Sequence, residues 1–280
     1  MTIDPRATIG TVELTVSDLD AQAAFYREAI GLTELRCEPE IVELGARDDD
    51  TPLVTLVHRP DAPPRPSRTT GLFHLALLVP TRDDLARAVH RVTRAAQRFT
   101  GASDHLVSEA FYLDDAEGNG IEIYHDRPRE EWERDGTELR MATLPLDLSS
   151  VLAGVDAGDV GDGMPAGTRV GHVHLQVSDI PEADAFYVGT LGFEPMVRSY
   201  PGALFVAAGG YHHHVGLNTW AGVGIPAPPV GALGLLRFTV VLPDAAALED
   251  VKGSVAAAGL EDGSDEIADP SGNRILLATR

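Results

Sequence analysis

The sequence predicts a mixed α+β fold made of repeated β-α-β-β-β modules, because long segments of the chain recur. The segment IGTVELTVSDLDAQAAFYREAIGL at 9–32 returns as VGHVHLQVSDIPEADAFYVGTLGF at 170–193. A second pair matches GLFHLALLVPTRDDLARAVHRV at 71–92 with GLLRFTVVLPDAAALEDVKGSV at 234–255. Apolar residues at every second position of these segments indicate half-buried strands.

The first repeated segment shows how each module begins. Val12, Leu14 and Val16 alternate with other residues, which predicts a strand with one buried face. A helix is expected next, since Asp18 stands where an N-cap residue would lie and Gly31 where a helix ends. The second copy has Asp179 and Gly192 at the same places.

The repeats predict four modules in two halves. DDAEGNGIEIY at 114–124 matches ADPSGNRILLAT at 268–279, and these segments end the second and the fourth module. Four such modules should give curled mixed sheets, with each half closing around a cavity. We expect an N-terminal domain over 1–126 with modules one and two (8–58 and 71–126), a linker over 127–167, and a C-terminal domain over 168–280 with modules three and four (169–220 and 234–280).

Composition limits the classes of function. A formal net charge of −21 repels phosphate backbones and anionic lipids, so neither nucleic acid nor a membrane is an expected partner. The apolar runs are too short to span a bilayer, and MTIDPRATIG has no secretory pattern, so we expect a cytoplasmic protein. Cys37 is the only cysteine, so a metal site would use nitrogen and oxygen ligands.

The stretch from Gly101 to Tyr124 carries the most specific chemistry. It places His105, Tyr112 and Glu122 in one strand–turn–strand unit, and His74 stands upstream on another expected strand. Imidazole and carboxylate groups are ligands for divalent metals, and a histidine near a tyrosine suits proton transfer. The sequence therefore indicates a metal site with an adjacent acid–base pair.

The repeats resemble the vicinal oxygen chelate superfamily, which includes glyoxalase I, bleomycin-resistance proteins and extradiol dioxygenases. The likeness rests on the V-x-L-x-V-S-D pattern followed by Phe-Tyr and Gly, and it covers nearly the whole chain. Within the superfamily, GASDHLVSEAFYL, GNGIEIYHDRPREEW and GGYHHHVGLNTWAG look most like two-domain catechol 2,3-dioxygenases. The resemblance implies two domains with curled mixed sheets around cavities.

The extradiol signature is matched with two departures. His105, Tyr112 and Glu122 follow its spacing, but Ala116 replaces a usual proline and Ser103 stands where another residue type is expected. By this resemblance, His105 would be the acid–base residue near bound oxygen and Tyr112 would hydrogen-bond a substrate oxygen.

The resemblance also implies metal ligands from the first and last strands of a module. His74 and Glu122 occupy these positions in module two, and a third ligand is expected from the first strand of a partner module. That position is Thr11 in module one and His172 in module three. Module four has lost both of its ligand positions, to Arg237 and Leu276.

Three hypotheses follow. If modules two and three pair, His74, Glu122 and His172 form a two-histidine–one-carboxylate triad. If modules one and two pair, His74 and Glu122 bind metal with help from water or Glu13. In the third hypothesis the metal site has decayed and the cavity only binds a ligand. In the triplet at 212–214, strand alternation would direct at most His212 and His214 into one cavity, as additional ligands.

The leading hypothesis is an extradiol-type dioxygenase that cleaves a catechol-like aromatic ring with dioxygen. The resemblance implies a divalent metal, with Fe(II) expected and Mn(II), Zn(II) or Ni(II) chemically reasonable. Its partners would be a small aromatic substrate and dioxygen, and a homo-oligomer is compatible with the sequence. One alternative is a non-catalytic binding protein of the bleomycin-resistance type. The other is a glyoxalase-like isomerase or lyase, for which only the 212–214 region offers a fourth ligand.

Overall fold

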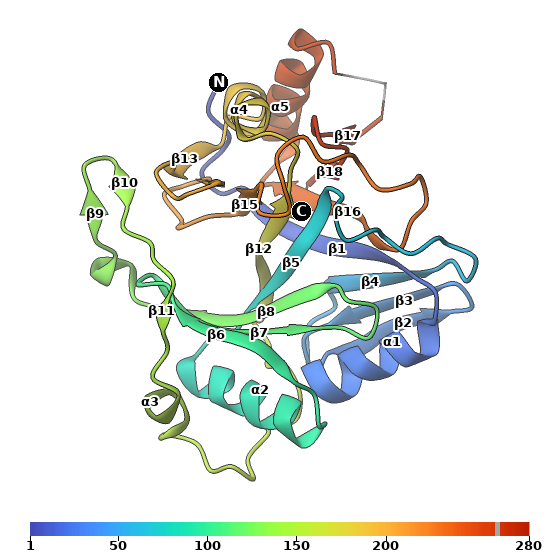
Figure 1. Cartoon of the computed structure of the whole chain (residues 1–280), viewed down its shortest axis with the longest axis vertical. Coiled ribbons are helices and arrows are strands. Elements are labelled where there is room, and N and C mark those ends of the chain that lie inside the picture. Colours follow the sequence, from blue (N-terminus) through green and yellow to red (C-terminus); the bar gives the residue numbers. More distant parts are fainter. Residues whose placement is uncertain (261–263, 280) are drawn as a thin grey trace.

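The computed structural model describes residues 1–260 and 264–279, and within them two large mixed sheets carry the fold (Figure 1). The smaller sheet has seven strands in the described residues, in the order β17 (Glu266–Ala268), β18 (Arg274–Thr279), β16 (Gly234–Leu242), β1 (Thr8–Val16), β4 (Pro52–His58), β3 (Ile41–Gly45) and β2 (Thr33–Glu38). The larger sheet has nine in the same residues: β11 (Leu144–Pro145), β6 (Phe99–Asp104), β7 (Ser108–Asp114), β8 (Gly120–Asp126), β5 (Gly71–Leu78), β12 (Arg169–Gln176), β15 (Val215–Asn218), β14 (Ala203–Ala207) and β13 (Glu194–Val197).

The predicted mixed α+β class is confirmed. In every module the first strand pairs in parallel with the last, as β5 does with β8 and β12 with β15. Modules one to three have the expected β-α-β-β-β order, whereas module four has only β17 and β18 after its helix in the described residues. The helices are α1 (Leu19–Phe25) with a π-helical turn at Tyr26–Ile30, α2 (Arg82–Arg94), α4 (Ile180–Asp184) with a similar turn at Ala185–Thr190, and α5 (Ala245–Ala257).

The sheets join modules from opposite halves of the chain. β5 of module two pairs antiparallel with β12 of module three, and β1 of module one pairs antiparallel with β16 of module four. The expectation that each half closes around its own cavity is therefore wrong, because inter-strand hydrogen bonds connect modules two and three in one sheet and modules one and four in the other. The larger sheet therefore contains the pairing of modules two and three, not the alternative pairing of modules one and two. The boundaries 1–126 and 168–280 remain a prediction about domains.

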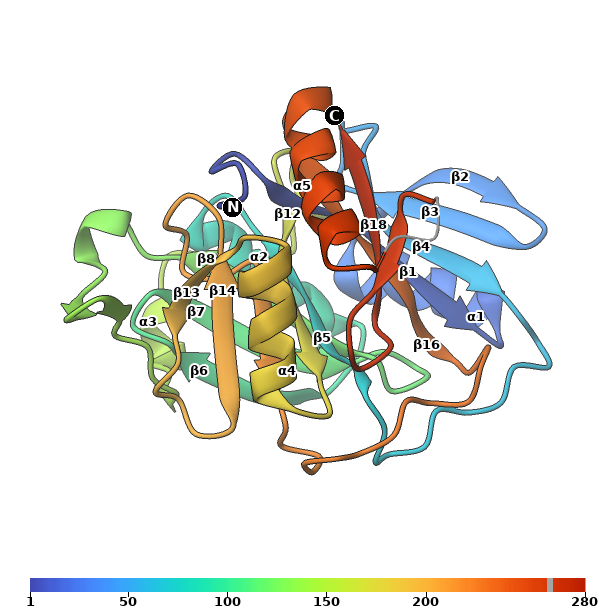
Figure 2. The same ribbon diagram turned by 90° about the horizontal axis from the view of Figure 1, so that it is seen from above.

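The helices, unlike the sheets, connect modules of the same half of the chain. The turn after α1 packs against α2, and α5 packs against the turn after α4. Both views show α4 and α5 side by side (Figure 1 and Figure 2). Each half is thus joined through its helices, while each sheet crosses between the halves.

The local expectations for the repeated segments are confirmed. Val12, Leu14 and Val16 are fully buried. The carboxylate of Asp18 accepts the backbone N–H of Ala21 at the start of α1. Gly31 has a φ of +89°, the left-handed conformation that glycine adopts at little cost when it ends a helix.

The segment between the halves is more than a connection. It contains a short helical turn (Arg129–Glu131), the hairpin β9 (Arg134–Asp135) and β10 (Glu138–Leu139), strand β11, and α3 (Leu148–Leu152). β11 extends the larger sheet by pairing with β6. Among the described residues, no helix is both long enough and apolar enough to cross a lipid bilayer.

Candidate active site

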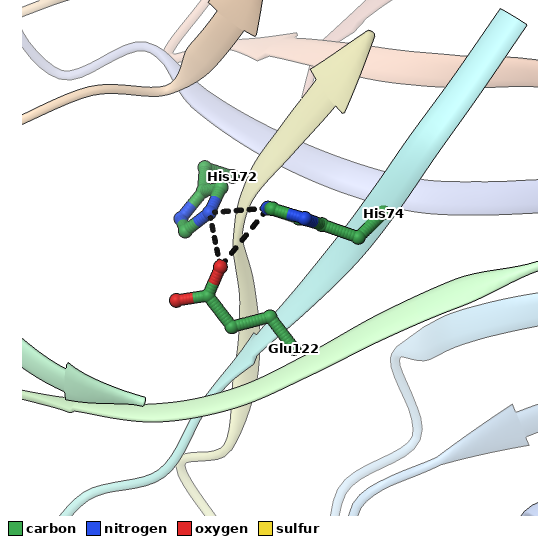
Figure 3. Close-up of side chains that lie close together, drawn as sticks. All are labelled: His74, Glu122 and His172. Atoms are coloured by element: carbon green, nitrogen blue, oxygen red, sulfur yellow. Dashed lines mark hydrogen bonds and ion pairs between the residues drawn. The ribbon is translucent and has the colours of Figure 1, made fainter. Parts of the chain in front are cut away.

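Three strands of the larger sheet bring His74, Glu122 and His172 together. His74 lies on β5, Glu122 on β8 and His172 on β12, and their ligand atoms converge as Figure 3 shows. The Nε2 atoms of His74 and His172 lie 2.9 and 3.2 Å from the same Oε2 of Glu122, and 3.4 Å from each other. All three side chains are buried. Two imidazoles and one carboxylate around one point form a donor set suited to a divalent cation.

Local backbone features aim these side chains. Glu122 alternates with the buried Ile121 and Ile123 on β8, so its side chain lies on the opposite face of the sheet. Between β5 and β12, the register pairs His74 with His174 and then Leu72 with Leu175, which leaves Phe73 as the extra residue of a β-bulge. A bulge bends the strand and re-aims side chains.

A glycine allows β8 to approach this bulge. A Cβ added at Gly120 would lie 2.1 Å from the carbonyl oxygen of Phe73 and 3.1 Å from the Cβ of His74. Any other residue at this position would push β8 away from β5. The glycine of the GNGIE segment therefore keeps Glu122 within reach of His74.

Burial and charge act against each other on the triad. Burial alone would raise the pKa of Glu122, yet the neighbouring His172 and His74 hold that pKa well below its usual value. Burial lowers the pKa of His172 to about 4, although Glu122 partly opposes this. The favoured charge state is a carboxylate beside a neutral imidazole, which is the ionisation state in which these groups bind a cation.

His105 and Tyr112 form a hydrogen-bonded pair beside the triad. The Nδ1 of His105 lies 2.7 Å from the carbonyl oxygen of Ala142, and its Nε2 lies 2.6 Å from the hydroxyl of Tyr112. Because a carbonyl only accepts, His105 carries its proton on Nδ1, and Tyr112 donates to Nε2. Tyr112 also lies directly across from Glu122 on the neighbouring strand. Burial, reinforced by the charge of Glu122, raises the pKa of Tyr112 well above its usual value, so the phenol keeps its proton.

These side chains line one cavity of about 220 Å³. This volume is below the roughly 300–1,000 Å³ of sites for drug-sized ligands, and it suits a single substituted ring. Aromatic and apolar side chains make up most of the remaining wall: Phe73, Met141, Ala142, Tyr200, Phe205 and Trp220. The segment between the halves thus contributes to the wall, because Met141 and Ala142 belong to it.

Other candidate residues lie away from the triad. Glu13 is on β1 of the smaller sheet, where its carboxylate lies 2.7 Å from the Nε of Arg237. Arg237 also reaches Glu266, with Nη1 2.9 Å from its carboxylate. The register pairs Glu13 with Arg237 just as it pairs His174 with His74 in the larger sheet. An ion pair therefore occupies the position in the smaller sheet that corresponds to the metal site.

The expectation for the histidine triplet is wrong in its choice of residue. His213 lines the cavity, whereas His212 and His214 do not. The alternation rule does not apply, because residues 211–214 are irregular backbone that follows the turn at 209–210, and β15 begins only at Val215. His212 instead lies against Asp126, and the Nδ1 of His214 accepts the backbone N–H of Ala208.

His174 is a cavity residue that the sequence reasoning missed. Its ring lies 5.0 Å from that of His74 and packs against Phe73 and Trp220. Its Nε2 is buried and has no hydrogen-bond partner among the described residues. The signal was available, because His172 and His174 are two residues apart on one strand and so share a face.

Comparisons with known proteins agree with this fold and site. Residues 8–123 match the model of the glyoxalase/bleomycin resistance protein/dioxygenase superfamily. The chain is 44% identical over 256 residues to the catechol-2,3-dioxygenase of Bacillus subtilis (strain 168), which covers 90% of this chain and 88% of that relative.

Solved structures show the same architecture at low sequence identity. A provisionally assigned dioxygenase from Bacillus subtilis superposes with a TM-score of 0.68 at 13% identity, over 100% of this chain and 86% of that one. Glyoxalase I from Zea mays gives a TM-score of 0.57 at 16% identity, over 97% and 92% of the two chains. These two likenesses concern the fold, while the 44% identity over nine-tenths of the chain establishes kinship. The chain therefore belongs to the glyoxalase/bleomycin resistance protein/dioxygenase superfamily.

Proposed function

We propose that this protein is a metal-dependent extradiol dioxygenase, which cleaves the ring of a small catechol beside its two hydroxyl groups and adds both atoms of dioxygen. The observation that carries the proposal is the convergence of His74, Glu122 and His172 in a cavity with mainly aromatic and apolar walls. The 44% identity to a catechol-2,3-dioxygenase supports the same reaction class.

The three side chains fit a divalent metal. Two neutral imidazoles and a carboxylate form the facial donor set associated with non-haem Fe(II), which leaves coordination positions open. When bound, such a metal supplies positions for the substrate oxygens and for dioxygen, and a path for electrons between them. Fe(II) is our choice, and Mn(II), Zn(II) and Ni(II) are the competitors to be tested.

The chain's own residues would orient the ring and manage protons. Tyr112 keeps its proton because burial raises its pKa, and since that proton is donated to Nε2 of His105, the phenol oxygen can accept a hydrogen bond from a substrate hydroxyl. His105 holds an unprotonated Nε2 beside that hydroxyl, since its Nδ1–H donates to Ala142. Proton transfer by a positioned histidine is effective because the imidazole pKa lies near neutrality.

The cavity wall favours an uncharged substrate. Among the described residues, no lysine or arginine lines it, and its one carboxylate is Glu122. A substrate with a carboxylate substituent would bring an unpaired anion into this apolar site, at a cost of desolvation. We therefore propose unsubstituted or alkyl-substituted catechols, acted on in a cytoplasmic setting.

The test is turnover after anaerobic loading with Fe(II). Catechol and air-saturated buffer should give oxygen uptake in a one-to-one ratio with a ring-opened product, and 3,4-dihydroxybenzoate should react far more slowly. Glu122→Gln, which preserves size and removes the charge, is the matched inactive variant.

Other outcomes of the same test separate the competing functions. Tight binding of catechol without turnover would favour a binding protein of the bleomycin-resistance type. Metal-loaded protein that binds no catechol would refute the proposal.

A further inference from the structure

Two large aromatic side chains, Phe73 and Trp220, line the cavity and are also exposed to solvent. The exposed fractions are 38% for Phe73 and 47% for Trp220, and their ring centres lie 5.4 Å apart in an edge-to-face arrangement. We call this pair the aromatic rim. Exposed apolar side chains at the edge of a cavity commonly mark a surface on which a ligand binds.

The β-bulge in β5 places Phe73 on the cavity side of the sheet. Leu75 and Leu77 are fully buried in the core on the other face. A regular strand would place Phe73 with them, because side chains two residues apart share a face. The extra residue of the bulge instead lets Phe73 and the adjacent His74 both line the cavity. The irregularity that aims His74 thus also supplies half of the aromatic rim.

Trp220 is exposed but held in a fixed position. Its indole N–H donates to the carbonyl oxygen of Pro201 at 3.0 Å, and its backbone N–H donates to the side-chain oxygen of Asn218 at 3.1 Å. The backbone at Gly202 lies close against the ring, since a Cβ added there would be 3.3 Å from Cδ1 of the indole. A side chain fixed in this way loses little conformational entropy when a ligand covers it, so the surface is preorganised for binding.

The inner cavity has room for one substituted ring, so a larger apolar substituent projects past the aromatic rim. The exposed part of the Trp220 indole corresponds to roughly 100 Å² of surface that such a substituent can cover. A tenfold gain in affinity needs only about 60 Å² of newly buried apolar surface. A second aromatic ring offers more than this area, and it can also stack on the indole or meet its edge.

We propose that Phe73 and Trp220 are specificity-determining residues that bind an apolar aryl substituent of the catechol at the mouth of the cavity. The inference rests on the proposed function, and it extends the substrate class from unsubstituted and alkyl-substituted catechols to aryl-substituted catechols. The dihydroxylated ring lies beside the triad, while the second ring lies against the indole of Trp220. The aromatic rim thus changes the affinity for the substrate and leaves the reacting atoms the same.

Binding to the Zn(II)-loaded protein tests the aromatic rim without turnover. Catechol, 3-phenylcatechol and 4-phenylcatechol are titrated by calorimetry, and the two phenyl isomers sample both directions in which the second ring can leave the cavity. At least one isomer should bind about tenfold more tightly than catechol. If catechol binds and neither isomer binds more tightly, the inference is overturned. If none of the three binds, the proposed function fails and the inference fails with it.

Variants assign the gain in affinity to the aromatic rim. Trp220→Ala should reduce the ratio of the phenylcatechol affinity to the catechol affinity to less than about threefold. Trp220→Gln keeps a long side chain but removes the aromatic surface, and it should lower the ratio likewise. The control is Trp132→Phe, which replaces the other tryptophan and should keep the ratio. An unchanged ratio in a folded, Zn(II)-loaded Trp220 variant would show that the phenyl group binds elsewhere.

Tryptophan fluorescence locates the bound ring. The chain has 2 tryptophans, so Trp132→Phe leaves Trp220 as the only emitter. Acrylamide should quench Trp220 in the free protein, and it should quench Trp220 less when the tighter-binding phenylcatechol is present. Equal quenching in both states would contradict the contact. A Trp220 that is already shielded in the free protein would mean that another surface, such as a second copy of the chain, covers the aromatic rim, and it would overturn the inference.

Discussion

Replacing His172 by alanine is the sharpest test of the metal site, because this residue comes from the opposite half of the chain to His74 and Glu122. In the structure its Nε2 lies 3.4 Å from the Nε2 of His74 and 3.2 Å from Glu122. Its loss leaves two of the three converging donors. Residues that merely support a ligand cost about 10–100-fold in metal affinity when mutated. Loss of a direct ligand should lower the metal affinity at least a hundredfold, which corresponds to about 2.7 kcal/mol of binding free energy.

The assay is metal content after anaerobic loading, followed by competition with a chelator of known affinity. The matched control is Thr11→Ala, since Thr11 occupies the corresponding first-strand position in the smaller sheet. His172→Ala should lose at least a hundredfold in Fe(II) affinity, while Thr11→Ala should bind like the wild type. Both variants must first show the wild-type far-ultraviolet spectrum. A folded His172→Ala that holds one ion with unchanged affinity would refute the site that we describe.

Three further predictions concern the surrounding residues. Tyr112→Phe should lower kcat/KM for catechol by about 1.5–3 kcal/mol, or roughly tenfold to a hundredfold, with metal content unchanged by elemental analysis. Gly120→Ala should weaken metal binding at least tenfold, because its Cβ would lie 2.1 Å from the carbonyl oxygen of Phe73; equal binding would show that β8 adjusts freely. Burial lowers the pKa of His214 to about 3, so the unfolded chain binds more protons between pH 6.5 and 3 and stability falls as the pH falls through this window. His214→Asn keeps an acceptor for the backbone N–H of Ala208 but removes the titrating imidazole. The free energy of unfolding, measured with urea at pH 6.5 and 5, should therefore fall less in this variant than in the wild type, by up to about 1.4 kcal/mol per pH unit.

Much of the fold follows from local patterns in the sequence. Alternation in the first strand and the N-cap aspartate Asp18 appear where predicted, because both depend on residues close in sequence. The superfamily was identified correctly from the repeats, and the positions of His74 and Glu122 on the first and last strands of module two followed from the same resemblance.

The pairing of modules could not be predicted. It depends on hydrogen bonds between β5 and β12, whose residues His74 and His172 are separated by 98 positions in the chain. The bulge at Phe73 and the irregular backbone that carries His213 were not predicted for a related reason. Both interrupt the strict alternation of side chains between the two faces of a strand, from which a shared face is predicted.

The crossing of the sheets between halves has a consequence for biosynthesis. A nascent chain that has emerged only as far as β8 contains His74 and Glu122 but lacks β12, and with it one of the three converging donors. The site is completed only after the second half begins to fold onto the first. A divalent metal can therefore meet all three donors only when the cavity walls supplied by Phe205 and Trp220 can form as well. Under the proposed function, the order of assembly would limit the time during which an incomplete, open polypeptide holds a divalent ion.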